Sequence, residues 1–477
     1  MEGLRAQAFL LALALVLGTT TKVLALRLPP DVKTGVPNGT DGMEVIGDMI
    51  IPDELHKYLK TLNIQRKVIA APNYRWPEEA GTPTVPFALS SSVFGYQDVI
   101  KEAMEHWEQH TCIRFREKGD IDKSYIDFVK ESGCWSFVGK ISSINSQKIS
   151  IGSGCQHFGI VVHEIGHAIG LIHEQMRPDR DSFLHINLDN VAPQNYQQFT
   201  KYSPNNYFTY EVEYDYTSVM QYGGMDFTKN GKVTMATEKA EYQGLLGRGQ
   251  ALSHRDKLAV NRHYGCIDKW EAKCNVADDV CQNGGYVGED CSCVCPSGTS
   301  GQNCQKKTAD YYDAELPSCN RRITEETEIS SPNYPQSIPI NTWCVYQIEA
   351  PAGMIVKLTF EAFSLQRYTD SGPLRCATAF LEIRDFDKYE GNIFCGTDIK
   401  SQESIMSNST NMILYLDTPY SPYSKGFKAR VSFISQEEKS VSEAINPINP
   451  TTESSDAGVA ANLQITLLAI IFIHAFV

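Results

Sequence analysis

The chain has 477 residues, too many for one hydrophobic core, so we expect several folded units. Its hydrophobic share of 42% and charged share of 21% are ordinary for globular protein. The formal net charge of −14, without a long run of Lys and Arg, argues against a nucleic-acid partner, because contact with phosphates needs clustered basic side chains.

The first residues have the pattern of a secretory signal peptide. Arg5 precedes an apolar run, Phe9–Leu17, and small residues follow it. The run is too short to cross a bilayer as a helix, and the residues from Gly18 to Ala25 suit cleavage. We therefore assign residues 1–25 to a signal peptide and expect a secreted, extracellular protein.

Residues 26–67 lack a strong pattern and end at the dipeptide Arg66-Lys67, which suits a basic processing site. We interpret them as a propeptide, and a flexible N-terminal arm is the alternative. Sequons at Asn38 and Asn408 predict glycosylation and agree with secretion.

Residues 68–266 have the length of one domain. The apolar residues of 99–107 recur with helical spacing. Those on the shared face are Ile100, Ala103, Met104 and Trp107. Short strand-like runs at 85–89 and 125–129 complete a mixture that predicts an α+β fold.

Three histidines near residue 170 have a spacing that suits a metal site. His163 and His167 are four residues apart, so on a helix both imidazoles lie on one face and can reach one tetrahedral ion. Glu164 adjoins the first histidine and is placed to act as the catalytic base on a water molecule at the ion.

A third histidine follows a glycine that can end this helix. Gly170 can adopt positive φ, after which the chain can bring His173 to the same ion. Three protein ligands leave one position open for water, as in catalytic zinc sites. Imidazole ligands favour zinc without excluding other transition metals. The alternative, ordinary core or surface histidines on a helix, does not account for the third histidine.

The pattern H-E-x-x-H-x-x-G-x-x-H resembles the zinc-binding motif of the metzincin peptidases. Its continuation through Glu174 and residues 177–181 resembles the astacin family within that group. Further segments that resemble astacin sequences are 76–77, 85–87, 133–136 and, as the Met-turn, 218–222. The resemblance implies an α+β metzincin peptidase domain with a zinc cleft over residues 68–266.

The resemblance also implies roles outside the motif. Met220 would lie beneath the zinc, and Tyr222 would bind it at rest and then hydrogen-bond the oxyanion, although composition alone would make both core residues. Glu174 would pair with the N-terminal ammonium that processing creates, at a first residue between Val68 and Ala70.

Two further positions are compared with the family pattern. Residues 45–48 resemble the propeptide motif F-x-G-D, with Val45 in place of the aromatic residue. Asp48 would then take the water position on zinc and keep the zymogen inactive. Arg248 lies one place earlier than a basic residue that lines the family's primed pocket, and a preference for an acidic residue after the cut is the corresponding expectation.

The 14 cysteines indicate a disulfide-rich protein of an oxidising compartment, and the signal peptide disfavours the alternative of a cytosolic metal cluster. Residues 270–305 resemble an EGF-like module, and residues 319–434 resemble a CUB domain, an all-β sandwich. Runs at 356–360 and 380–384 alternate as strands do. The resemblances imply the bridges Cys112–Cys266, Cys134–Cys155, Cys274–Cys291, Cys281–Cys293, Cys295–Cys304, Cys319–Cys344 and Cys376–Cys395.

Many CUB domains bind calcium through three acidic residues. The corresponding positions here hold Gln366, Ala379 and Asp417, so only one carboxylate remains and a calcium site is not expected.

The C-terminal residues divide into two segments. Residues 435–456 are rich in Ser, Thr, Asn, Pro and Glu, which predicts a disordered linker. Residues 457–477 form an apolar tail, and the small residues before it resemble a GPI-anchor signal. A single membrane span is the alternative.

The sequence thus predicts a secreted zinc metalloendopeptidase, made as a zymogen, that hydrolyses extracellular proteins or peptides. Its EGF-like and CUB modules would recognise matrix or surface proteins. The alternative is a non-catalytic adhesion protein that acts through these modules. Loss of Glu164 or of a motif histidine would favour that alternative, and all four residues are present.

Overall fold

The computed structural model describes residues 43–52, 55, 64–67, 74–202, 206–208, 210–276, 280–369, 371–420 and 423–445. The predicted signal peptide, the Asn38 sequon, residues 68–70 and the apolar tail lie outside the described residues. The chain divides after Ile434 into two compact units. Among the helices that are described, none is long and apolar enough to cross a membrane.

The N-terminal domain is built on an eight-stranded sheet. In spatial order its strands are β1 (Met43–Ile46), β2 (Met49–Pro52), β8 (Cys134–Phe137), β9 (Ser146–Ile151), β7 (Tyr125–Val129), β5 (Thr82–Leu89) and β4 (Glu78–Glu79), with β6 (Arg114–Glu117) paired to β5. Strands β5, β7 and β9 run parallel, and β8 is antiparallel to β9. The predicted runs at 85–89 and 125–129 are therefore strands of this sheet.

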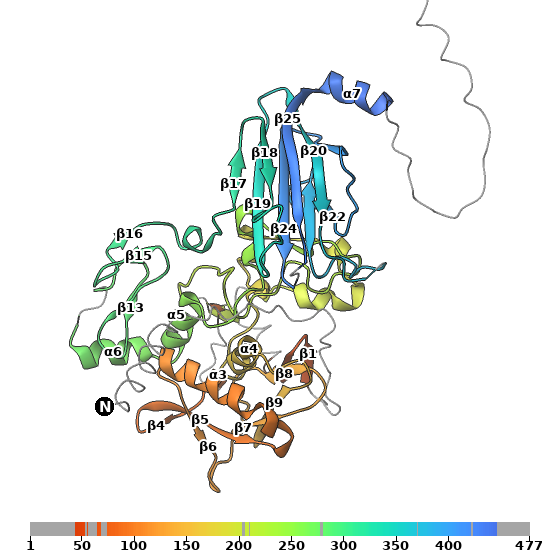
Figure 1. The fold of residues 1–477 in the computed structure, drawn as a ribbon. Helices are drawn as coiled ribbons and strands as arrows, with labels where there is room; N and C mark the ends of the chain where they lie inside the picture. Colours follow the sequence, from red (N-terminus) through yellow and green to blue (C-terminus); the bar gives the residue numbers. More distant parts are fainter. Residues whose placement is uncertain are drawn as a thin grey trace, which may run out of the picture. The chain divides into compact units, whose positions relative to one another are not determined.

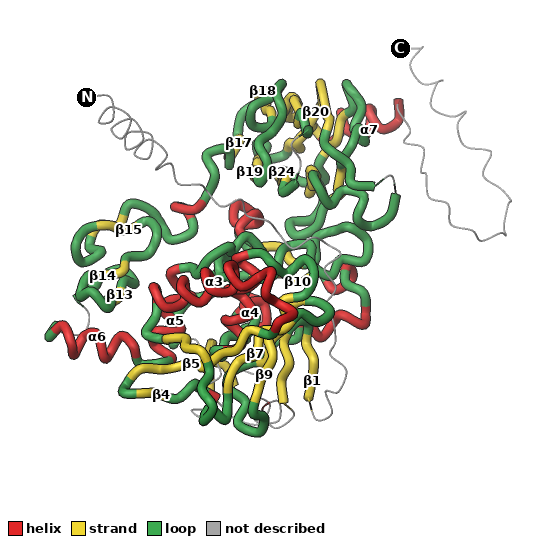
Figure 2. Tube along the Cα trace, turned by 60° about the horizontal axis from the view of Figure 1, so that its bottom comes forward, coloured by secondary structure: helices red, strands yellow, loops and turns green. Residues whose placement is uncertain are grey.

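Two helices, α3 (Gln97–His110) and α4 (Phe158–Ala168), pack on each other, and α4 packs on β8 and β9. Figure 2 shows both helices beside strands β5, β7 and β9. The predicted amphipathic face is confirmed, because the buried residues of α3 are Ile100, Ala103, Met104 and Trp107. The α+β prediction is also confirmed.

Strands from the segment before residue 68 are part of the same sheet. Strands β1 and β2 form an antiparallel hairpin, and β2 pairs in parallel with β8. Met49, Ile50 and Ile51 are fully buried. Further along, β3 (Ile64–Lys67) pairs in parallel with β11 (Asn206–Phe208). The residues 43–52 are therefore docked on the domain and do not form a loose arm.

The second half of the N-terminal domain consists mainly of short elements and loops. They are η3 (Glu174–Met176), η4 (Arg180–Ser182), the antiparallel pair β10 (Leu184–Ile186) and β12 (Met235–Thr237), η5 (Leu188–Asn190), η6 (Pro193–Phe199), η7 (Ala240–Leu245), α5 (His254–His263) and α6 (Cys266–Cys274). In the first half, η2 (Ser91–Tyr96) leads directly into α3. Disulfides join Cys112 to Cys266 and Cys134 to Cys155.

A small disulfide-rich segment follows α6. Two hairpins, β13 (Tyr286–Val287) with β14 (Cys293–Val294) and β15 (Thr299–Ser300) with β16 (Lys306–Lys307), make up its regular structure. Its bridges are Cys274–Cys291, Cys281–Cys293 and Cys295–Cys304, the first-to-third, second-to-fourth and fifth-to-sixth pattern that the EGF-like resemblance implies. Helix η8 (Asp313–Glu315) lies in the connection that follows.

The C-terminal domain is a sandwich of two sheets (Figure 1). One has the order β17 (Arg321–Ile323), β19 (Thr342–Glu349), β24 (Asn411–Thr418), β21 (Phe380–Arg384) and β22 (Asn392–Phe394). The other has the order β18 (Thr327–Ser330), β25 (Gly426–Ser435), β20 (Met354–Ser364) and β23 (Ser404–Met406). The predicted strands at 356–360 and 380–384 are confirmed. Bridges join Cys319 to Cys344 and Cys376 to Cys395.

The structure differs from the sequence prediction after this sandwich. Composition predicted a disordered linker over 435–456, but residues Gln436–Ile445 form helix α7. Ser435 and Glu438 form a reciprocal cap, in which each backbone N–H donates to the other side chain. The cap satisfies two backbone donors at the helix start, which composition does not register. Residues 446–456 lie outside the described residues.

Candidate metal centre and catalytic site

Helix α4 carries the first two motif histidines and is held by two tryptophan side chains, one near its middle and one at its C-terminal end. Trp107 donates its indole N–H to the carbonyl of Val162 at 3.2 Å, and Trp76 donates to the carbonyl of Ala168 at 2.9 Å. The helix is buried along most of its length. His163 and His167 therefore project from a rigid support, as a site of defined geometry requires.

Gly170 ends this helix and redirects the chain. Its φ is 112°, a value that side-chain-bearing residues rarely adopt, and the N–H of Leu171 donates to the carbonyl of Gly166 at 2.9 Å. The turn brings His173 back, with its ring centroid 4.8 Å from that of His167. The structure thus brings the three histidines together.

Backbone carbonyls orient two of the imidazoles. His163 Nδ1 lies 2.7 Å from the carbonyl oxygen of Val219, and His167 Nδ1 lies 2.9 Å from that of Leu171. A carbonyl only accepts, so each Nδ1 carries the proton and each Nε2 keeps its lone pair. Within the described part of the chain, the buried Nε2 atoms of His163, His167 and His173 make no hydrogen bond. Imidazoles prepared in this way suit metal ligation.

Asp48 faces the three Nε2 atoms from the turn between β1 and β2. Its carboxylate oxygens lie 3.3 Å from His163, 3.5 Å from His167 and 2.9 Å from His173. Burial by itself raises the pKa of Asp48, but the charge of His173 and the contacts with the three imidazoles hold that pKa well below its usual value. The four side chains place their ligand atoms within 4.8 Å of one another.

Gly47 lets this turn approach the site. Its φ is 66°, and a Cβ on it would lie 2.6 Å from both the Tyr222 hydroxyl and Gln198 Oε1. Only a glycine fits that space without displacing these side chains. Gly47 therefore allows the backbone to approach the site closely, and Asp48 supplies the carboxylate that faces the histidines.

Glu164 is buried beside His163, with 1% of its surface exposed. Burial, with a further contribution from the charge of Asp48, raises the pKa of Glu164 well above its usual value. A carboxyl group with a raised pKa is a stronger base than an exposed one, which suits a proton acceptor.

The Met-turn closes the site from the other side. Met220 is fully buried, and its Sδ lies 2.9 Å from the position of a Cβ on Gly166, so it packs against the side-chain-free face of α4. The Tyr222 ring lies 4.3 Å from the His173 ring, centroid to centroid. Burial raises the pKa of Tyr222 well above its usual value, so its hydroxyl remains a donor.

Two family models match the sequence. Astacin (Peptidase family M12A) matches residues 68–265, and the CUB domain matches residues 319–431. Residues 68–265 are therefore an astacin domain, and residues 319–431 are a CUB domain.

Curated relatives agree with this assignment. Protein SpAN of Strongylocentrotus purpuratus is 38% identical over 405 residues, which cover 82% of this chain and 63% of that protein. Blastula protease 10 of Paracentrotus lividus is 36% identical, with coverages of 80% and 64%. Zinc metalloproteinase nas-38 of Caenorhabditis elegans is 33% identical, with coverages of 81% and 51%. The chain therefore spans less than two thirds of the length of these relatives.

The residues of the astacin domain fit a zinc ion. Three buried imidazole Nε2 atoms converge with one carboxylate, and nitrogen and oxygen donors are zinc ligands. His163, His167 and His173 would hold the zinc, with Asp48 as the fourth ligand while the N-terminal segment is present.

A second set of residues supports the astacin Met-turn, and sequence reasoning missed it. Asp256, buried at the start of α5, accepts from the hydroxyl of Ser218 at 2.6 Å and from the N–H of Val219 at 2.9 Å. The carbonyl of the same Val219 orients His163. A signal was available, because Ser253-x-x-Asp256 is a capping-box pattern, and the structure forms that box.

Glu174 and Arg248 have partners within the chain. Glu174 Oε1 accepts from Arg177 at 3.0 Å and from the N–H of Asp215 at 2.8 Å, and the residues expected to form the mature N-terminus lie outside the described residues. The Arg248 guanidinium binds Asp417 of the CUB domain at 2.6 Å. Arg248 therefore has an ion-pair partner in the CUB domain, and the preference for an acidic residue after the cut stays a prediction.

Proposed function

We propose that this chain is a secreted zinc-dependent endopeptidase, made as a zymogen, that hydrolyses peptide bonds of extracellular proteins. The observation that carries the proposal is the convergence of three buried Nε2 atoms on the carboxylate of Asp48, with Glu164 beside them. A metal-ligand set, a general base and an occupying carboxylate meet at one point, which is the arrangement of a latent metallopeptidase.

Zinc at this position supplies Lewis acidity toward a peptide carbonyl and a water molecule. Glu164 takes the proton of the attacking water on its carboxylate and returns it to the leaving amine. Tyr222, protonated through burial, donates its hydroxyl to the oxygen on which negative charge develops.

Latency follows from where Asp48 lies. A carboxylate against all three histidines would compete with water for a zinc ion held there, and the β1–β2 hairpin that carries Asp48 is anchored in the sheet through β8. Removal of residues 26–67 would take this carboxylate away. Glu174, fixed by Arg177 and Asp215, is then the expected partner of the new N-terminal ammonium.

Several features support secretion. All 14 cysteines are paired in seven bridges, which persist in oxidising compartments. Asn408 is exposed at the start of a turn before β24, where a glycan can be attached. The disulfide-rich segment as an EGF-like module, recognition of matrix or surface proteins, and a GPI-anchor signal in the tail remain parts of this proposal.

The test is cleavage of an unfolded protein substrate by the chain after processing at Arg66-Lys67. We expect 1,10-phenanthroline to abolish cleavage and added zinc to restore it. Glu164→Gln should still bind one zinc but lower kcat by roughly 10²–10⁴-fold, since a general base is removed while the ligands stay.

Glu105→Gln, on the exposed face of α3, is the matched control and should cleave at the wild-type rate. Chelator-resistant cleavage, or full activity of Glu164→Gln, would contradict the proposal. Absence of cleavage by zinc-loaded wild-type protein would favour the non-catalytic adhesion alternative.

A further inference from the structure

The CUB domain and the astacin domain share a hydrophobic core. The shared cluster includes Tyr216, Tyr242, Leu245 and Leu246 of the astacin domain with Trp343, Val345, Phe380 and Tyr415 of the CUB domain. The short helix η7 contacts strands β19 and β24. A Cβ on Gly244 would lie 2.1 Å from the Trp343 ring, so the indole rests on the glycine. This face of the CUB domain is therefore occupied by its own chain.

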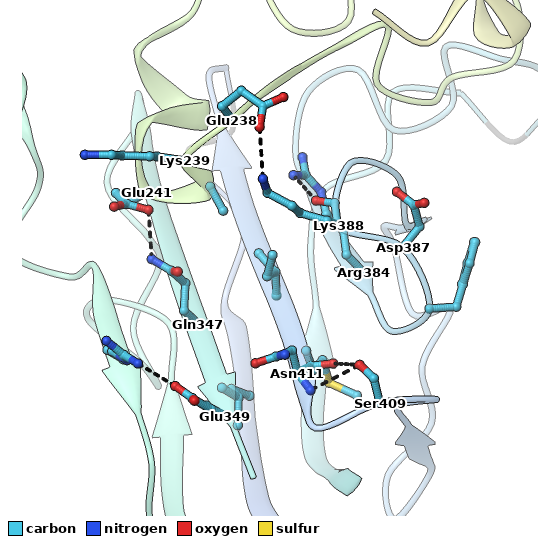
Figure 3. Close-up of a pocket in the computed structure, with 16 residues that line it drawn as sticks. Glu238, Lys239, Glu241, Gln347, Glu349, Arg384, Asp387, Lys388, Ser409 and Asn411 are labelled. Atoms are coloured by element: carbon cyan, nitrogen blue, oxygen red, sulfur yellow. Dashed lines mark hydrogen bonds and ion pairs between the residues drawn. The ribbon is translucent and has the colours of Figure 1, made fainter. Parts of the chain in front are cut away.

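Polar contacts surround this shared core. Lys388 donates to Glu238 at 3.0 Å, and Gln347 donates to Glu241 at 3.1 Å (Figure 3). Arg384, almost fully buried, donates to Gln243 at 3.0 Å. The pocket of about 530 Å³ beside these contacts is lined by both acidic and basic side chains and so favours no ligand of one charge. These residues serve docking between the domains.

Among the described residues, the most buried ion pair between the two domains joins Arg248 to Asp417. The guanidinium Nη2 lies 2.6 Å from Asp417 Oδ1, and the two side chains are 10% and 0% exposed. Asn341 accepts from the same guanidinium, and Tyr415 donates to the other oxygen of Asp417 at 2.7 Å. Removal of one partner from such a pair leaves a buried charge uncompensated, which strongly favours the intact pair.

The backbone on either side of Arg248 packs against the Met-turn. A Cβ on Gly247 would lie 2.5 Å from the Cα of Gly223 and 3.4 Å from the carbonyl carbon of Tyr222. A Cβ on Gly249 would lie 2.8 Å from the Cα of Val219. The segment 247–249 thus lies against both ends of the segment that carries Met220 and Tyr222.

We propose that the CUB domain positions the catalytic centre: Asp417 holds Arg248, and Arg248 holds the Met-turn backbone that carries Tyr222 and the His163-orienting carbonyl. Arg248 is then a positioning residue and does not select the substrate. The proposal rests on the peptidase function proposed above for the kinetic part of its test.

The experiment uses the full-length processed chain with Asp417→Asn, with the milder variant Asn341→Ala, and with the charge swap Arg248→Asp plus Asp417→Arg. The matched control is Glu349→Gln, which removes the exposed ion pair with Arg322 on the same CUB sheet. Two quantities are measured: hydrogen–deuterium exchange of the backbone of residues 218–223, and kcat and KM separately.

We expect Asp417→Asn to speed exchange of residues 218–223 and to lower kcat on the order of 10-fold with little change in KM, because the shift acts on Tyr222 and not on substrate contacts. Asn341→Ala should also speed exchange and lower kcat, but by less. The charge swap should restore part of the lost protection from exchange and part of the lost kcat. The proposal would be overturned if folded Asp417→Asn had the exchange rate and kcat of the wild type. If Asp417→Asn does not fold, the same result for Asn341→Ala would overturn it. Exchange decides the coupling even if the wild-type chain cleaves nothing, so the two proposals fail separately.

Discussion

Asp256 shows how a residue outside the metal site can govern it. Its carboxylate fixes Ser218 and Val219, and the carbonyl of Val219 sets the tautomer of His163. The carboxylate is fully buried and also caps α5 through Ser253. The Asp256 carboxylate therefore both caps the start of α5 and positions the residue that orients His163, a predicted zinc ligand.

Replacing Asp256 with Asn should weaken zinc binding by about 10- to 100-fold, because groups that orient metal-ligating histidines contribute to affinity in this range. In the variant, the side-chain amide nitrogen at position 256 would face an N–H or O–H group that now donates to a carboxylate oxygen. The thermal midpoint of the variant should therefore also fall. Zinc competition with a chromophoric chelator measures the affinity. Asp268→Asn, exposed in the first turn of α6, is the control. Equal affinity in the Asp256 variant and the wild type would contradict this account.

At the scale of elements, the β1–β2 hairpin combines a strong anchor with a single reactive side chain. Met49, Ile50 and Ile51 are fully buried, and burial of such side chains stabilises by about 1.5–3 kcal/mol each. The pairing of β2 with β8 adds backbone hydrogen bonds. The buried side chains and the pairing with β8 do not involve the Asp48 side chain. A mutation of Asp48 can therefore remove the inhibition and leave the hairpin docked.

Asp48→Ala should produce premature activity in a zymogen whose Arg66-Lys67 site has been replaced to prevent processing. The hairpin would stay docked, but the carboxylate would no longer compete with water at the three histidines. Hydrolysis of a fluorogenic peptide should rise at least about 10-fold over the parent zymogen, equivalent to about 1.4 kcal/mol. Glu44→Gln, on the same hairpin, should remain latent. If Asp48→Ala is equally latent, the carboxylate is not what silences the site.

At the scale of the whole molecule, covalent and non-covalent links hold distant segments around the site. Cys112, which follows α3, is bonded to Cys266, the first residue of α6, across 154 residues of chain. The CUB domain is docked through η7 and Arg248. Segments from most of the described chain are therefore linked around the candidate metal site.

Replacing Cys112 and Cys266 together with Ser should lower the free energy of unfolding by about 2–5 kcal/mol, since the bridge restricts a long loop in the unfolded chain. The thermal midpoint of the full chain, followed by near-UV circular dichroism, measures the loss. Removing Cys295–Cys304, which closes a span of only 9 residues, should cost less. A larger loss from the short bridge would show that loop length does not decide the effect.

The metal site could be predicted from sequence because its geometry is local. Four residues of helix align His163 with His167, and Gly170 marks the helix end, so nearby residue types largely fix where the ligands lie. The amphipathic face of α3 and the strands of the CUB sandwich follow from short periodicities for the same reason. Helix α7 was missed because one reciprocal cap outweighs a polar composition.

What the sequence determined by itself was the donor set, its local spacing and the domain order, since these depend on residues close together in the chain. Only the tertiary structure decided which distant groups meet that site. It paired β2 with β8, placed the Asp256 carboxylate at the N–H of Val219, and paired Arg248 with Asp417. Such contacts depend on how whole elements pack, and no local pattern of residues specifies their partners.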